Sequence, residues 1–414
     1  MDIQKLYRLF EAHPRISTDS RKIVPDSIFF ALRGANFDGN RFAAAAIDQG
    51  ATAAVVDDRA VYDANPALHE RMVLCDNVLE ALQALAHEHR RRLNIPILAI
   101  VGSNGKTTTK ELTAAVLARK FRIHATSGNL NNHIGVPLTL LAMDAATQLG
   151  VVEIGASACG EIALLASIAA PDMGIITNIG LSHLEGFGGT EGIRRGKGEL
   201  YDWLAAHGGR AFIRHEDQTL TAMAAERPQM VADYYPTALA DGVQSNLAGD
   251  YNRYNIAAAV AIGRHFGVDE ADIRAAIAEY EPSNNRSQRV VTERNTLIAD
   301  CYNANPSSME AAIRNFASEP MDGRRHRVMI LGDMLELGEW SAQQHESIAQ
   351  LAASTDAEVL LTGTNFKAAA NPSLRAFASR EELEEYLRIN MISDSLVLIK
   401  GSRGIGLEKV IPLL

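Results

Sequence analysis

Short apolar runs separated by amphipathic segments recur along this chain. Between residues 95 and 281 these runs are four to six residues long and almost uniformly apolar. Such runs are typical of strands buried on both faces of a parallel sheet, and the segments between them favour helices. We expect strands at residues 97–101, 150–154, 174–179 and 211–214, and a long helix at 255–266.

The flanking segments repeat this α/β pattern. Before Pro96 the pattern predicts strands at 27–32 and 51–56 and helices at 42–49 and 78–93. In the last third it predicts strands at 296–300, 327–331, 358–362 and 395–400, alternating with helices at 309–316, 341–354 and 380–390. The run Pro282-Ser283-Asn284-Asn285 is typical of a linker. We therefore expect an α/β chain of three domains, at residues 1–94, 95–281 and 282–414.

The run 97–101 ends in a loop rich in glycine and hydroxyl groups, before a helix that we expect at 111–119. Backbone N–H groups at such a turn face an anion, a lysine adds positive charge, and a hydroxyl can hold Mg²⁺. The usual motif has a glycine five residues before Gly105, where this chain has Ile100. The alternative is a strand–turn–helix junction with a chance match, but the context favours a nucleoside triphosphate. The loop reads Gly102-Ser103-Asn104-Gly105-Lys106-Thr107-Thr108.

Two further polar residues follow predicted strands, where open α/β sheets bind ligands. Glu153 closes the strand 150–154 and is a candidate Mg²⁺ ligand, the alternative being a surface acid at a strand end. His183 lies on a glycine-rich loop after the strand 174–179. It is a candidate metal or substrate group, although a lone histidine is more often structural.

Other candidate groups are less specific. Asp300 ends a strand and is followed by two amides, which could bind ribose or phosphate-bound water or could form a turn and a helix cap. The loop 332–339 repeats that arrangement with acidic residues. Lys197 lies in a basic stretch that composition alone assigns to a solvated helix face.

Composition and charge exclude several classes of protein. The 414 residues include 47% hydrophobic and 22% charged residues, as in an ordinary soluble globular protein. A net charge of -10 argues against nucleic acid as a partner. The three cysteines are scattered, and no apolar run approaches the ~20 residues of a membrane span. We expect a cytoplasmic monomer without membrane insertion.

Taken in order, these clusters resemble the Mur ligases of peptidoglycan synthesis over essentially the whole chain, and among them the MurF branch. The phosphate loop alone marks only the superfamily. Further matching stretches are residues 17–21, 29–34, 38–39, 128–137, 153–156, 160–162, 183–187 and 399–404. Two runs are more specific to the branch, namely Asp300-Cys301-Tyr302-Asn303-Ala304-Asn305-Pro306 and Gly332-Asp333-Met334-Leu335-Glu336-Leu337-Gly338.

The resemblance implies a fold and a reaction. The fold would have a central P-loop domain with a parallel sheet and a C-terminal Rossmann-like domain. The reaction would be the ATP- and Mg²⁺-dependent ligation of D-alanyl-D-alanine to UDP-MurNAc-tripeptide through an acyl phosphate. The N-terminal domain would hold the UDP end of the substrate.

The resemblance also implies roles for single residues. Lys106, His183 and Lys197 would act in catalysis. Mg²⁺ ligands would be Thr107, Glu153, His183 and, if it is carbamylated, Lys197. ATP contacts would come from Gly102, Ser103, Asn104, Gly105, Lys106, Thr107, Thr108, Asn255, Arg286 and Asp300. Substrate contacts would come from Ser20, Arg21, Asn131, Asn132, Ser402 and Arg403.

Two departures and two alternatives accompany this resemblance. Val101 stands where threonine usually precedes the loop, and Tyr251 stands where histidine is common. One alternative is a sister ligase with another amino-acid or folate-type acceptor, which the two branch-specific runs disfavour. The other is a nucleotide-binding protein or P-loop kinase without ligase activity, in which the segment 17–21 and the third domain have no evident role.

Overall fold

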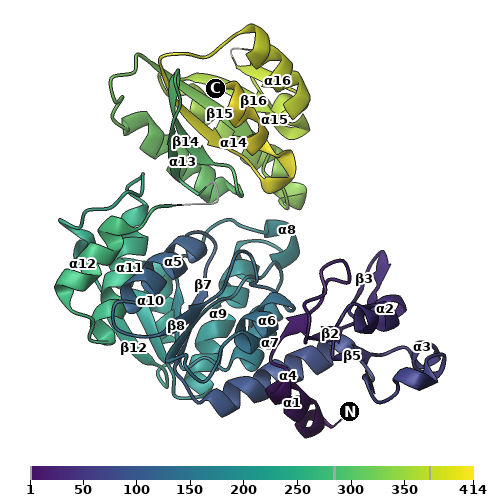
Figure 1. Cartoon of the computed structure of the whole chain (residues 1–414). Coiled ribbons are helices and arrows are strands. Elements are labelled where there is room, and N and C mark those ends of the chain that lie inside the picture. Colours follow the sequence, from purple (N-terminus) through teal and green to yellow (C-terminus); the bar gives the residue numbers. More distant parts are fainter. Residues whose placement is uncertain (1, 283–285, 373) are drawn as a thin grey trace.

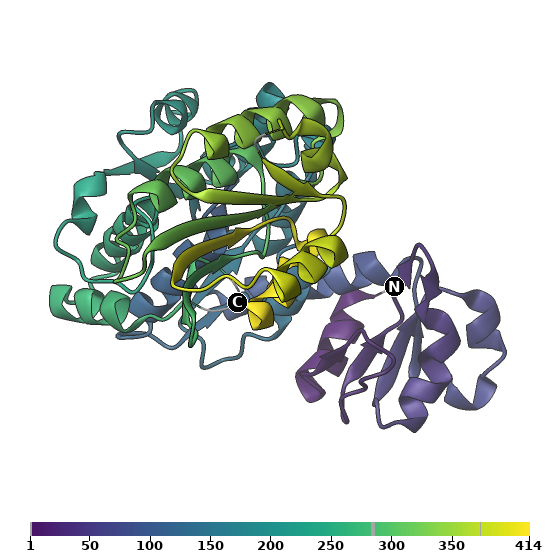
Figure 2. The ribbon, with the colours of Figure 1, turned by 90° about the horizontal axis from the view of Figure 1, so that it is seen from above.

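The structure, a computed structural model, describes residues 2–282, 286–372 and 374–414. Within those ranges the strands form three main sheets and a small hairpin, and each main sheet takes its strands from one continuous part of the chain. The C-terminal sheet lies above the central one and the N-terminal sheet lies to one side (Figures 1 and 2). The α/β class is confirmed. The domain boundaries stay predictions, and residues 283–285 of the expected linker lie outside the described residues.

In the N-terminal part, one long helix joins two sheets. This helix, α4 (Val78–Leu93), begins at a cap formed by the side chain of Asn77 and ends at Asn94 in the left-handed conformation. Leu82 of α4 shares a hydrophobic cluster with Phe30 of the N-terminal sheet and Ile97 of the central sheet. The parallel strands, in sheet order, are β1 (Ile16–Ser17), β2 (Ile28–Phe30), β5 (Ala53–Val56) and β6 (Met72–Leu74). The other elements are α1 (Ile3–Ala12), the hairpin β3 (Arg33–Gly34) and β4 (Phe37–Asp38), α2 (Ala43–Asp48) and α3 (Arg59–Asp63).

The central sheet is parallel throughout and is covered on both faces. Along its middle strand β7 (Ile97–Val101), Leu98 and Ile100 pack in one hydrophobic cluster, whereas Ala99 and Val101 pack in another. Two covered faces explain why these strands are uniformly apolar rather than alternating. The sheet order is β12 (Val231–Tyr235), β11 (Arg210–Arg214), β10 (Met173–Ile176), β7, β9 (Leu149–Glu153) and β8 (Ile123–Ala125).

The helices of the central part correct one expectation. The helix after the phosphate loop, α5 (Lys106–Leu117), begins five residues before the predicted start at residue 111. Gly105 has φ +78, which lets the chain turn sharply into the helix, so that Lys106 and the hydroxyl residues occupy its first turn. The remaining helices are α6 (Gly135–Leu141), α7 (Glu161–Ala169), α8 (Leu184–Phe187), α9 (Thr190–Ala206), α10 (Gln218–Ala225), α11 (Asn252–His265) and α12 (Glu270–Glu279).

The C-terminal sheet places two charged residues side by side. Its strands β14 and β18 pair in parallel, with Asp300 opposite Lys400 at their carboxyl ends. Only β13 of the described strands in this sheet runs antiparallel to its neighbour. None of the helices in the described part of the chain is both long and apolar enough to cross a membrane. The sheet order is β13 (Gln288–Val291), β14 (Asn295–Asp300), β18 (Ser395–Lys400), β15 (His326–Gly332), β16 (Glu358–Thr362) and β17 (Arg375–Phe377), and the helices are α13 (Pro306–Ser318), α14 (Ser341–Ala353), α15 (Thr364–Ala369) and α16 (Arg380–Ile389).

Candidate active site

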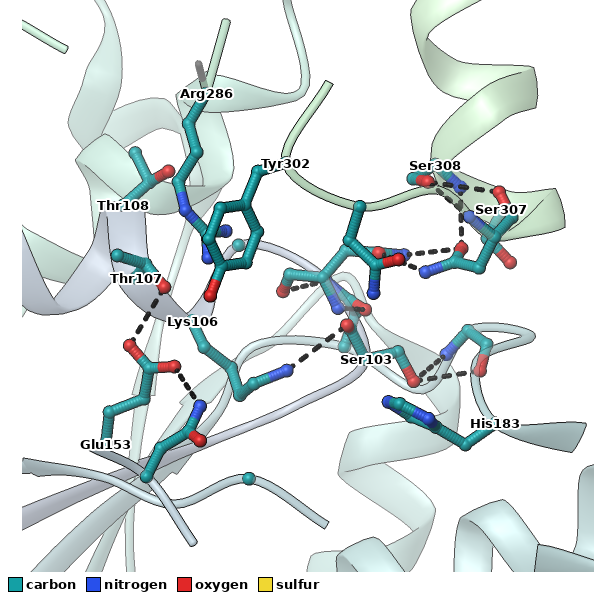
Figure 3. A pocket seen from close by; sticks show the side chains of 18 of the residues that line it. Ser103, Lys106, Thr107, Thr108, Glu153, His183, Arg286, Tyr302, Ser307 and Ser308 are labelled. Atoms are coloured by element: carbon teal, nitrogen blue, oxygen red, sulfur yellow. Dashed lines mark hydrogen bonds between the residues drawn. The ribbon is translucent and has the colours of Figure 1, made fainter. Parts of the chain in front are cut away.

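A cavity of about 840 Å³ lies where the carboxyl ends of the central strands face the C-terminal sheet (Figure 3). The phosphate loop after β7, Glu153 at the end of β9 and residues 178–180 after β10 line one side. The opposite side is lined from the ends of β14 and β18 and from the start of α13. Because β7 lies between β9 and β10, neighbouring strands deliver all the central groups to one point.

The phosphate loop has the geometry of an anion site. Thr107 and Thr108 line the cavity and lie in the first turn of α5, where backbone N–H groups lack helical partners. Lys106 Nζ donates to the carbonyl oxygens of Gly102 at 2.7 Å and Ser103 at 3.3 Å, so the ammonium is folded back on its own loop. Burial lowers the pKa of Lys106 from its ordinary value. An anion in the loop would give this partly desolvated cation a charged partner.

Glu153 is a buried carboxylate, with 2% of its surface exposed, held by two neutral donors. Thr107 Oγ1 donates to its Oε2 at 2.9 Å, and Asn131 Nδ2 donates to its Oε1 at 2.8 Å. A hydroxyl and a carboxylate beside a phosphate site form the oxygen-rich donor set that Mg²⁺ prefers. Within the described ranges no cluster of three or more His, Cys, Asp or Glu side chains could hold a metal. Mg²⁺ sites completed by phosphate oxygens and water need no such cluster, so these residues fit that ion.

His183 lines the same cavity and meets a residue of the C-terminal part. Its Nδ1 lies against the carboxylate of Glu336, from the loop after β15. The neighbouring imidazole lowers the pKa of the Glu336 carboxyl. Figure 3 shows the ring of His183 on the side of the cavity where Ser103 lies.

Lys197, by contrast, does not line the cavity. It is 1% exposed and lies on α9, where its Nζ donates to the carbonyl oxygen of Ala156 at 3.4 Å and sits 4.8 Å from the centre of the Phe187 ring. Burial, and then the charge of Lys106, lower its pKa to about 7. Ala156 itself lines the cavity, so Lys197 lies directly behind the wall. The basic, solvated helix face that composition favours is wrong for this residue.

The C-terminal wall brings together two expected ATP contacts, Asp300 and Arg286, with a lysine that the sequence analysis did not single out. Lys400 Nζ donates to Asp300 Oδ2 at 2.6 Å, and the Arg286 guanidinium stacks on the Tyr302 ring, 3.8 Å from its centre. Lys400 could have been found as the lysine that ends an otherwise apolar strand. Asn305, the cap of α13, also bridges the two parts, because its Nδ2 donates to Asn104 Oδ1 at 2.7 Å.

Three family models match successive parts of this chain. They are described as "Mur ligase family, catalytic domain" at residues 14–90, "Mur ligase middle domain" at 100–241 and "Mur ligase, glutamate ligase domain" at 285–403. The chain belongs to the Mur ligase family. Together the matched residues span most of its length, and they include both walls of the cavity.

Individual Mur ligases are similar over nearly the whole chain. The UDP-N-acetylmuramoyl-tripeptide–D-alanyl-D-alanine ligase of Bacillus subtilis (strain 168) is 34% identical, over 96% of this chain and 92% of that protein. A crystal structure of MurF from Acinetobacter baumannii superposes with a TM-score of 0.86 at 27% identity, covering 99% of this chain and 97% of the other. MurF ligase from Thermotoga maritima, in complex with ADP, has the same fold at 24% identity, with a TM-score of 0.84 and 97% of each chain covered.

The remaining residues expected from the Mur ligase resemblance are only partly brought together. Asn255 lines the cavity beneath the phosphate loop, and its Oδ1 accepts from Thr109 Oγ1 at 3.1 Å. Asn132 also lines it, while its Oδ1 accepts from the backbone N–H groups of residues 134 and 135. A Cβ at Gly105 would lie 2.5 Å from Asn255 Oδ1, so the loop and α11 are closely fitted.

Four expected substrate residues lie apart from this cavity lining. Ser402 is buried, and its Oγ accepts from the backbone N–H of Leu335 at 3.0 Å. The Arg403 guanidinium lies 5.6 Å from the Tyr302 ring, at the edge of the C-terminal wall. Ser20 and Arg21 belong to the N-terminal part, where the exposed Arg21 side chain pairs with Asp19 at 2.9 Å. The roles expected of these residues stay predictions.

Proposed function

We propose that this chain is the ATP-dependent ligase that joins D-alanyl-D-alanine to UDP-MurNAc-tripeptide in the cytoplasmic stage of peptidoglycan synthesis. The observation that carries the proposal is one cavity whose walls are the phosphate loop and the segment that begins at Asp300. The full-length similarity to the Bacillus subtilis ligase supports the same reaction and acceptor.

The first step forms an acyl phosphate. An oxygen of the peptide's terminal carboxylate attacks the γ-phosphorus of ATP, the bond from phosphorus to the bridging oxygen breaks, and ADP leaves. Phosphoryl transfer depends mainly on positioning and on stabilising the transferring charge. Lys106 and the N–H groups of the first turn of α5 do this. Lys106 Nζ exchanges its two loop carbonyls for phosphate oxygens when ATP binds.

Mg²⁺ would be held by Thr107 and Glu153, with His183 serving a second ion. The ions supply positive charge that lets two anions, the carboxylate and the γ-phosphate, approach each other. The neutral amine of Lys197 can add to CO₂ and release one proton, which turns the uncharged side chain into a carbamate anion. The pKa of about 7 provides that neutral amine near neutral pH. Asn131 Nδ2 donates to Oε1 of Glu153 and so helps to fix the orientation of this carboxylate.

The second step forms the amide bond. The amine of the dipeptide attacks the acyl carbon, phosphate leaves with the bridging oxygen, and the amine loses a proton. Ser402 and Arg403 would contact the peptide groups from the C-terminal side, with Asn132 on the opposite side. Ser20 and Arg21 would hold the UDP end, while Asn255, Arg286 and Asp300 would bind the nucleoside and phosphates of ATP.

A coupled assay of phosphate release tests the proposal. Release should require ATP, Mg²⁺, UDP-MurNAc-tripeptide and D-alanyl-D-alanine together. Equal phosphate release when either the UDP-MurNAc-tripeptide or the D-alanyl-D-alanine is omitted would refute the proposal, and so would no release when all four components are present. Single amino acids replacing the dipeptide test the sister-ligase alternative, which predicts that one of them supports faster release.

A further inference from the structure

Two residues with unusual backbones face each other between the central and C-terminal parts. His183 has φ +53 and Glu336 has φ +62, a left-handed conformation that is unfavourable for residues with a Cβ. The His183 Nδ1 and the Glu336 carboxylate are in contact. Such strain persists where the surrounding structure fixes it, and it concentrates at functional sites.

The segments that carry these two residues are packed together. Leu184 and Phe187 of α8 share a hydrophobic cluster with Met334 and Leu337 of the loop after β15. The backbone N–H of residue 185 donates to the carbonyl oxygen of Glu336 at 3.4 Å. The apolar contacts therefore hold the two parts together, since an ion pair as exposed as this one, with side chains 25% and 59% exposed, attracts only weakly.

The loop that carries Glu336 is also fixed from behind. The backbone N–H of Met334 donates to Nε2 of the fully buried His345 at 3.0 Å. The carboxylate of Asp333 accepts from the N–H groups of Asn365 and Phe366 at the start of α15. Glu336 is therefore presented by a rigid support rather than by a free loop.

We propose that Glu336 is a positioning residue that orients the imidazole of His183 from the opposite domain. A carboxylate in close contact with Nδ1 favours the hydrogen of the neutral ring on that nitrogen, and this would leave the lone pair of Nε2 for a ligand. A carboxylate or carbonyl partner at the second nitrogen is how proteins commonly orient a metal-binding histidine. That the ligand is a divalent ion rests on the proposed function. The orientation of the His183 ring does not rest on the proposed function. It requires only that the C-terminal part, which carries Glu336, is docked on the central part.

The first test reads the ring directly, in protein free of metal and nucleotide. Nitrogen-15 NMR of histidine-labelled protein at about pH 8.5 should show His183 as the Nδ1–H tautomer, with its signals assigned by their loss in His183→Asn. Glu336→Ala should shift the ring toward the Nε2–H form, and Glu336→Gln should retain Nδ1–H because its amide oxygen still accepts. The matched control is Glu339→Gln, an exposed neighbour, which should change nothing. An Nε2–H ring in the unmodified protein, or no shift in Glu336→Ala, overturns the inference.

The second test uses the working enzyme. Glu336→Ala should raise the Mg²⁺ concentration that gives half-maximal rate by about tenfold, and it should leave the KM for the UDP-linked substrate unchanged. Glu336→Gln should lie close to the unmodified enzyme. A tautomer shift without any change in Mg²⁺ requirement would retain Glu336 as the orienting residue and remove the metal role of His183. If the unmodified protein released no phosphate under any condition, that result would instead count against the proposed function.

Discussion

Replacing Lys197 with methionine should stabilise the central part of the protein, and most strongly at and below neutral pH. Methionine keeps the length and most of the volume of lysine but carries no charge. The Lys197 side chain is fully buried beside Phe187, with one carbonyl as its hydrogen-bond partner. A buried ammonium without a carboxylate partner opposes folding, because the unfolded chain solvates it better.

The pKa of Lys197 sets the magnitude and the sign. Folding lowers that pKa from 10.5 to about 7, so between these values the unfolded chain binds a proton that the native state lacks. Stability therefore rises with pH across this window, and the penalty is complete below about pH 7. Linkage gives a penalty of roughly 5 kcal/mol at about pH 6.5 and only roughly 1 kcal/mol at about pH 9.5. At the lower pH, Lys197→Met should therefore remove most of this penalty and have the higher free energy of unfolding.

Urea unfolding followed by tryptophan fluorescence measures this effect. The chain has two tryptophans, and Trp203 lies on the same helix as Lys197. A Trp340→Phe background therefore makes the signal report on the central part. Both variants are unfolded in CO₂-depleted buffer, so that the lysine is unmodified. A stability difference that is the same at both pH values, or a Lys197→Met protein that is less stable at about pH 6.5, would refute the reasoning.

Three further substitutions test the two walls of the cavity. Gly105→Ala should weaken ATP binding at least about tenfold by calorimetry, because φ +78 and the 2.5 Å approach to Asn255 leave no room for a Cβ; unchanged affinity would contradict the loop geometry. Lys106→Ala should lower kcat roughly 100-fold or more in the phosphate-release assay, through lost stabilisation of the transferring phosphoryl group. Lys400→Met should cost about 3 kcal/mol in thermal unfolding by leaving the Asp300 carboxylate unpaired, and adding Asp300→Asn should restore most of it.

The local sequence predicted the strands that are buried and uniformly apolar. The strand β7 and the strands 358–362 and 395–400 have the predicted bounds, since apolar runs of this length fit a sheet covered on both faces. The strands β8 and β12 were missed, because they lie at the edges of the central sheet and are only partly buried, without a clear period.

Site residues could be predicted from the sequence where a side chain lies at the end of a predicted strand. They were harder to predict where contacts between distant segments determine the position of the side chain. Glu153 ends a predicted strand, and the cavity contains it. Lys197 looked like a surface lysine, because nothing in its neighbours shows that α8 and the segment at Ala156 cover it. The contact between His183 and Glu336 joins loops that are far apart in sequence, so only the docked domains reveal it.

Transfer of an isotope from substrate to phosphate tests the central claim most directly. UDP-MurNAc-tripeptide carrying ¹⁸O in both oxygens of its terminal carboxylate is incubated with ATP, Mg²⁺ and D-alanyl-D-alanine, and the released phosphate is examined by mass spectrometry. An acyl phosphate requires one ¹⁸O in each phosphate and the other in the new amide carbonyl. Unlabelled phosphate accompanying the product would contradict the account.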